Sequence, residues 1–118
     1  MTSVLLIATV TCAVANVSVA VADYVRAPFV RANSAEVHVP PWAVPYLATL
    51  KLAGAVGLVA GLLGVHRLGL AAAIGLTVFF VGAVLVHVRT RVFHNIAFPG
   101  VYLLLAVAST GFFAAGVR

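Results

Sequence analysis

The chain alternates between long apolar stretches and short polar segments. Four stretches carry a single charged residue between them, Lys51, and they cover residues 4–22, 46–65, 68–86 and 96–117. Each is close to the roughly 20 residues that a helix needs to cross the hydrocarbon core of a bilayer. The pattern predicts an all-α integral membrane protein: an antiparallel, up-down-up-down four-helix bundle that forms one transmembrane domain over residues 1–118.

The connections between these stretches differ in length. Residues 23–45 form the one long connection, and their mixture of charges, prolines, Val, Phe and Ala predicts an amphipathic segment lying on the membrane surface or folded back onto the bundle. His66 and Arg67 are expected to form a tight turn, and residues 87–95 a second short one. Residues 1–22 lack the basic start of a signal peptide, so we expect them to be retained as the first span.

An even number of spans places both termini on one side of the membrane, which we call the terminal side. Residues 23–45 and 87–95 then share the opposite face, the loop side. Most of the basic residues fall there: Arg26, Arg31, Arg89 and Arg91, with Lys51 nearest to that side, against Arg67 and Arg118 on the terminal side. The positive-inside rule therefore predicts a cytoplasmic loop side and external termini.

Composition narrows the class of protein further. Hydrophobic residues make up 64% of the chain and charged residues 8%, which is too little charge for the surface of a soluble domain. The net charge of +5 is scattered through apolar sequence, so it forms no patch for nucleic acid. Cys12 is the single cysteine, which excludes an intramolecular disulfide and a dithiol relay within this chain.

Small and polar residues recur at helical spacing inside the spans. The glycines of the second span lie on one face, which we expect to be buried against another helix of the bundle or of a partner chain: Gly54, Gly57, Gly61 and Gly64. Gly75 and Gly82 repeat this pattern in the third span. Two polar trios have members seven residues apart and are expected to face protein: Thr9, Asn16 and Asp23, and Asn95, Tyr102 and Ser109.

Ionisable side chains concentrate on the loop side, so any site is expected to open there. Lys51 lies about 8–9 Å inside its helix from Tyr46. Its amine either snorkels to the headgroups or pairs with Asp23 or Glu36. His87 is either a polar helix cap or a general acid or base beside Asp23.

These observations give a candidate site on the loop side. The candidate catalytic residues are Asp23, Lys51, His87 and Asn95, in which Asp23 or His87 would move a proton while Lys51 or Asn95 steadies negative charge. The candidate substrate-binding residues are Asn16, Trp42, Tyr46, Arg89 and Tyr102. No metal-ligand spacing, glycine-rich phosphate loop or nucleophile elbow is present, so we expect neither a metal nor a cofactor.

Three segments carry a resemblance to a known family: VPPWAVPYLATLKLAGAVGLVAGLL at 39–63, GLTVFFVGAVLVHVR at 75–89 and NIAFPGVYLLLAVAS at 95–109. They resemble the DoxX-like family of small bacterial membrane proteins, which implies a four-helix fold and a multi-pass location in the bacterial inner membrane. Relatives in that family are associated with quinone-linked sulfur oxidation, thiol-oxidation complexes and unassigned biosynthetic roles. The position of Lys51 is often acidic in the family.

Several functions remain open on the sequence. The first is binding of a lipophilic small molecule at the loop side, with cofactor-free acid–base catalysis in a biosynthetic pathway. A second is an accessory subunit of a quinone-linked oxidoreductase, docked through the glycine face as a partner-chain or homo-oligomer contact. The third is a non-catalytic membrane protein. Transport is a weaker fourth, because four short spans leave little room for alternating access.

Overall fold

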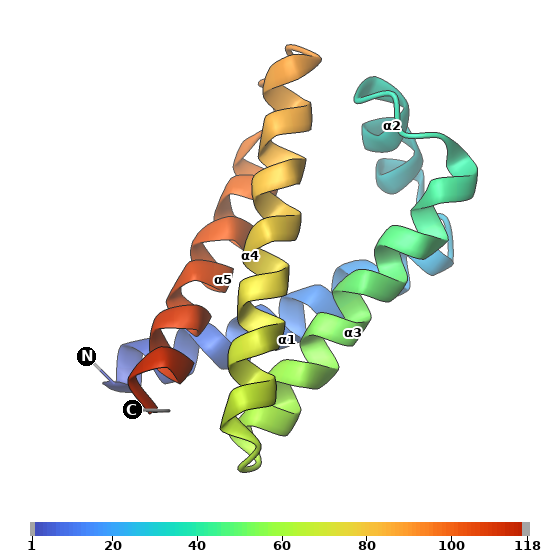
Figure 1. Ribbon diagram of the computed structural model, residues 1–118. Coiled ribbons are helices and arrows are strands. Elements are labelled where there is room, and N and C mark those ends of the chain that lie inside the picture. Colours follow the sequence, from blue (N-terminus) through green and yellow to red (C-terminus); the bar gives the residue numbers. More distant parts are fainter. Residues whose placement is uncertain (1, 117–118) are drawn as a thin grey trace.

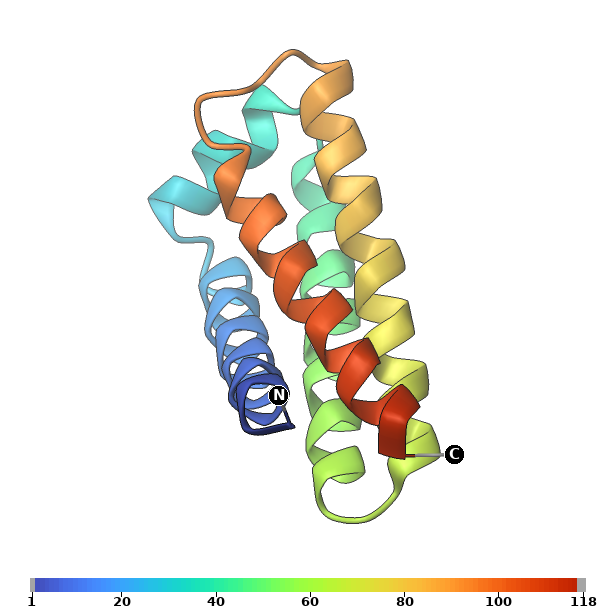
Figure 2. The ribbon, with the colours of Figure 1, turned by 90° about the vertical axis from the view of Figure 1, so that its left-hand side faces the viewer.

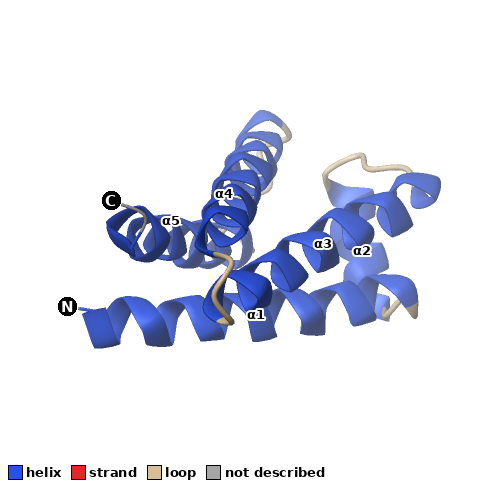
Figure 3. Ribbon diagram, turned by 60° about the horizontal axis from the view of Figure 1, so that its bottom comes forward, coloured by secondary structure: helices blue, strands red, loops and turns tan. Residues whose placement is uncertain are grey.

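The computed structural model describes residues 2–116. Met1, Val117 and Arg118 lie outside the described residues, and with them the predicted end of the fourth span at Val117 and the terminal-side charge of Arg118. The described chain is helical with short loops and contains no strand (Figure 3). Its elements are α1 (Thr2–Tyr24), α2 (Pro28–Glu36), the 3-10 turn η1 (Pro41–Ala43), α3 (Val44–Leu62), α4 (His66–Arg89) and α5 (Ala97–Gly116).

Four of these helical segments are long and apolar enough to cross a membrane. They are Thr2–Tyr24, Pro41–Leu62, His66–Arg89 and Ala97–Gly116, so the four-span prediction is confirmed. The spans form a ring in which α1 packs on α3 and α5, and α4 packs on the same two helices. Both chain ends lie at one end of the bundle, and α2 and the α4–α5 connection lie at the other (Figures 1 and 2).

The interior of the bundle is unusually polar for so apolar a chain. Thr9 and Asn16 are fully buried and Asp23 is 4% exposed, so the first polar trio faces protein as predicted. Ser109 of the second trio is also fully buried. Leu58 and Leu76 are buried in the apolar core, but many other large aliphatic side chains point outward, where they would face lipid, because lipid gives no hydrophobic reward for burying them.

Four helices end in the same hydrogen-bonded arrangement, a Schellman motif. After α1, the N–H of Ala27 donates to the carbonyl of Ala22 at 3.0 Å and that of Arg26 donates to Asp23 at 3.1 Å. The residue in the left-handed conformation is basic at the three loop-side ends: Arg26 (φ 55°), His38 (φ 62°) and Arg91 (φ 59°). The positive charges of Arg26 and Arg91 interact favourably with the partial negative charge of the helix C-terminus.

Gly64 has this role at the end of α3, with φ +126°. Two sequence predictions were wrong here for the same reason. Gly64 lies beyond α3 and is exposed, so it does not belong to the buried glycine face. The turn predicted at His66 and Arg67 falls instead at residues 63–65, because the glycine stops α3 early and α4 already begins at His66.

The other three glycines of this face bring α3 and α4 into close contact within the same chain. A Cβ placed on Gly61 would lie 2.5 Å from the Cα of Gly69, and one on Gly57 would lie 2.5 Å from the Cβ of Ala72. Gly54 lies against Leu76. Beyond this contact the two helices diverge towards the loop side (Figure 1). The glycine face is therefore covered within the bundle, and its pinched contact determines where the helices separate.

We expect Gly61→Ala to destabilise the bundle. The added methyl group would meet the Gly69 backbone and the Phe113 ring, 2.5 and 2.7 Å away, and such overpacking costs about 1–3 kcal/mol. Unfolding in mixed detergent micelles measures the change. The control is Gly75→Ala, whose Cβ meets nothing within 4 Å. Equal stability of the two variants would contradict the close contact between α3 and α4.

Candidate functional site

The divergence of α3 and α4 leaves a pocket of about 670 Å³ at the loop side. Its walls come from α1, α2, α3, α4 and the start of α5, and most of its lining is apolar, with four phenylalanines: Phe29, Phe79, Phe80 and Phe98. Six polar side chains also line it: Asp23, Asn33, Ser34, Lys51, His87 and Asn95. This size and composition are typical of small-molecule sites, in which a few polar groups orient a largely apolar ligand.

An ion pair lies in this pocket. Lys51, two turns into α3, extends its amine to Asp23 in the last turn of α1, with Nζ 2.5 Å from Oδ2. The side chains are 12% and 6% exposed, and the Lys51 amine also lies 5.8 Å from the centre of the Phe79 ring. A charged amine inside an apolar wall is costly unless it is paired. The structure therefore agrees with the interpretation in which Lys51 pairs with Asp23, and not with the one in which its amine snorkels to the headgroups.

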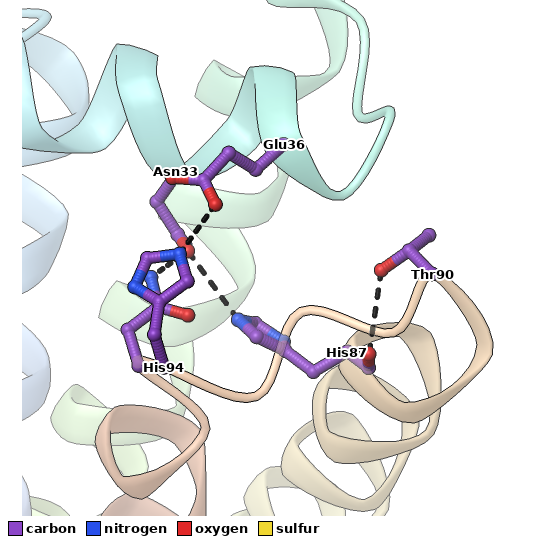
Figure 4. Close-up of polar contacts among 6 residues, drawn as sticks. Asn33, Glu36, His87, Thr90 and His94 are labelled. Atoms are coloured by element: carbon purple, nitrogen blue, oxygen red, sulfur yellow. Dashed lines mark hydrogen bonds and ion pairs between the residues drawn. The ribbon is translucent and has the colours of Figure 1, made fainter.

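A second polar group joins α2 to the opposite end of the pocket (Figure 4). Nδ1 of His87 donates to the carbonyl of Ala83 at 2.8 Å, and Nε2 lies 3.3 Å from Oδ1 of Asn33. The same oxygen accepts from Nδ2 of Asn95 at 2.6 Å. Nδ1 carries the proton of the first contact, because a carbonyl oxygen can only accept a hydrogen bond. Both ring nitrogens of His87 are engaged with the protein.

An exposed contact continues this group at the surface. His94 Nε2 lies 2.5 Å from Oε2 of Glu36, so the end of α2 is joined to the α4–α5 connection (Figure 4). Val30 and Val37 provide the apolar part of the attachment, since each is 7% exposed. The long connection thus folds back onto the bundle, which is one of the two arrangements that the sequence predicted. Residues 23–45 and 87–95 meet at one end, as the even number of spans requires.

The candidate catalytic residues converge on the pocket. Asp23, Lys51, His87 and Asn95 come from four different helices or their ends, and all four line it. The candidate substrate-binding residues do not line it. Three of them are exposed: Arg89, and Trp42 and Tyr46, which are about 70% exposed and contact each other edge to face. The other two face the interior of the bundle. Asn16 is fully buried beside Cys12, and the Tyr102 hydroxyl donates to the carbonyl of Ala15.

Asn33 is the site residue that sequence reasoning missed. It contacts both His87 and Asn95, and Ser34 beside it also lines the pocket. The sequence contains a pattern that indicates this placement: Val30, Asn33, Ser34 and Val37 have the i, i+3, i+4, i+7 spacing of residues on one face of a helix. Within residues 2–116 no three His, Cys, Asp or Glu side chains lie close enough to hold a metal ion.

The fold and the pocket define a class of protein: a four-span helical membrane protein with a few polar groups set in an apolar cavity at one end. Within this class, the chain belongs to the DoxX-like family, whose sequence model matches residues 7–109. The match confirms the resemblance and extends it over most of the first span. Neither the curated proteins nor the solved structures gave a match. The chain is thus a multi-pass membrane protein.

We expect Asp23→Leu to lower the free energy of unfolding by about 3 kcal/mol, because it leaves the Lys51 amine buried without its partner. The double variant Asp23→Leu/Lys51→Met removes both charges and should recover most of that loss. Unfolding in mixed micelles measures both variants. If the double variant were as unstable as the single one, the unpaired charge of Lys51 would not be the cause of the lost stability.

We expect Asn33→Leu to loosen α2. The change removes the oxygen shared by His87 and Asn95, so amide hydrogen exchange over residues 28–36 should accelerate by about tenfold, roughly 1.4 kcal/mol of local stability. Arg31→Ala is the control, because Arg31 is exposed on the same helix. Unchanged exchange in the Asn33 variant would mean that the two buried valines hold α2 without help.

Proposed function

We propose that this protein binds a lipophilic small molecule in the loop-side pocket, within a bacterial inner membrane, and that Asp23 and Lys51 are its acid–base groups. The observation that carries the proposal is an ionised pair placed inside an apolar cavity that diverging spans leave open. Holding charge there is expensive, and charged side chains that face a cavity inside a membrane-spanning bundle are typical of functional sites. A ligand of this kind can partition into the bilayer before it reaches the pocket.

The pair is suited to proton transfer without a cofactor. Asp23 can accept a proton from a bound molecule, and the Lys51 ammonium beside it can stabilise the negative charge that develops. His87 and Asn95 line the other end of the pocket, where they hold α2 in place through Asn33. The protein would then be a small acid–base enzyme of a biosynthetic pathway.

The alternatives have less support. An accessory subunit docked through the glycine face would need that face to be open, whereas Gly54, Gly57 and Gly61 pack against α4. A non-catalytic anchor would have no use for a charge pair withdrawn from the headgroups. No separate observation favours either role, so ligand binding in the pocket is the function that we propose.

We expect Gly82→Leu to block the pocket without harming the fold. Gly82 lines the cavity, and a Cβ placed there meets nothing within 4 Å, so a leucine would grow into the ligand's space. The probe is an uncharged medium-chain alkyl alcohol carrying a diazirine, photolysed with purified protein in nanodiscs. Peptide mass spectrometry should find labels on pocket residues in the wild type and at least about tenfold fewer in the variant.

Gly75→Leu is the matched control. It lies seven residues earlier on α4 and has equal free space, but it does not line the pocket. We expect labelling of pocket residues in this variant to equal that of the wild type, and both variants to remain folded by circular dichroism. Equal labelling of the pocket in all three proteins would overturn the proposal, because it would mean that the probe does not occupy the cavity.

A further inference from the structure

The hydrogen-bonding capacity of the charge pair is only partly used. Lys51 Nζ and Asp23 Oδ2 form an ion pair, but the buried Oδ2 makes no hydrogen bond, so Asp23 keeps its acceptor capacity and the Lys51 ammonium its N–H donors. No side-chain hydrogen bond of either residue is present within residues 2–116. Both residues line the pocket. A ligand therefore meets an unused acceptor and unused donors side by side.

A complementary group must donate one hydrogen bond and accept another at nearly the same point. A hydroxyl group does both with a single oxygen, since it carries one O–H and two lone pairs. An ether or ketone accepts only, and a carboxylate accepts while being repelled by Asp23. An ammonium donates only and is repelled by Lys51. The pair is also neutral in sum, so it offers no net attraction to a charged ligand.

We infer that the ligand of this pocket is an uncharged lipophilic alcohol or phenol, whose hydroxyl donates to Asp23 Oδ1 and accepts from Lys51 Nζ. This inference rests on the proposed function and specifies its ligand. The surrounding wall fits the rest of such a molecule, because Phe79 lies beside the amine and valine and phenylalanine side chains line the remainder. Between mainly apolar walls, these two hydrogen bonds to charged groups are stronger than their equivalents in water.

The same geometry provides the acid–base step. The O–H bond of the ligand breaks, its proton moves to Asp23 Oδ1, and the electron pair stays on the ligand oxygen. The resulting alkoxide or phenolate lies beside the Lys51 ammonium, which stabilises it. A phenol is the better proton donor of the two classes, and its ring suits the phenylalanine wall.

The test compares competitors that share one alkyl chain. Wild-type protein is photolabelled with the diazirine alcohol in the presence of the unlabelled alcohol, its methyl ether, the carboxylate or the ammonium. We expect the alcohol to protect the pocket peptides at a concentration at least tenfold below that needed for any of the others. Equal protection by the ether would overturn the hydroxyl inference, and stronger protection by either charged competitor would overturn it as well.

Two variants separate this inference from the proposed function. Asp23→Leu/Lys51→Met removes both partners together, so alcohol and ether should then protect equally while the pocket remains labelled. Glu36→Gln/His94→Gln removes an exposed pair outside the pocket and should keep the tenfold preference. A preference that survives in the first double variant overturns the inference alone. Labelling that is insensitive to Gly82→Leu overturns the proposed function.

Discussion

The structure depends on how closely α3 and α4 can approach. Lipid surrounds these helices with a solvent as apolar as their own side chains, so close backbone contact has to provide the attraction that water would otherwise supply. Gly57, Gly61 and Gly69 allow that contact near the terminal side. Towards the loop side, Leu76 and then Phe79 and Phe80 replace small residues in α4, and the helices separate. The pocket is a consequence of where the small residues stop.

The polar groups of the pocket divide into two sets with different tasks. His87 and Asn95 both contact Oδ1 of Asn33 and thereby fasten α2, while the buried Oδ1 of Asn95 has no partner. Asp23 and Lys51 are paired but not saturated. Phe79, whose ring lies beside the Lys51 amine, is eight residues or about 12 Å along α4 from His87, so the two sets contact different turns of this helix. Under the proposed function, the ligand contacts Asp23 and Lys51, while Asn33, His87 and Asn95 hold α2 against the pocket.

Much of this arrangement could be predicted from the sequence because topology acts on whole segments. Four apolar stretches fix the number of spans, an even number fixes which connections meet, and this brings Asp23, Lys51, His87 and Asn95 to one end. The direction of single side chains is not fixed in that way. Trp42 and Tyr46 are on the correct side of the bundle but point outward, as aromatic residues at a membrane interface commonly do. Asn33 was missed because its segment was not treated as a helix with its own buried face.

The basic residues show why the distribution of charge is an ambiguous guide to the orientation of the protein in the membrane. Arg26 and Arg91 contribute to the charge asymmetry from which a cytoplasmic loop side is predicted, yet each also occupies the left-handed position that ends a helix. At that position glycine would relieve backbone strain of roughly 1–2 kcal/mol, whereas a cation interacts with the exposed carbonyls and with anionic headgroups. Basic residues that end a helix therefore cannot be counted only as evidence for the orientation of the protein in the membrane. Asp23 and Lys51 instead pair with each other inside the pocket, which is why the proposed function is assigned to them and not to the surface charges.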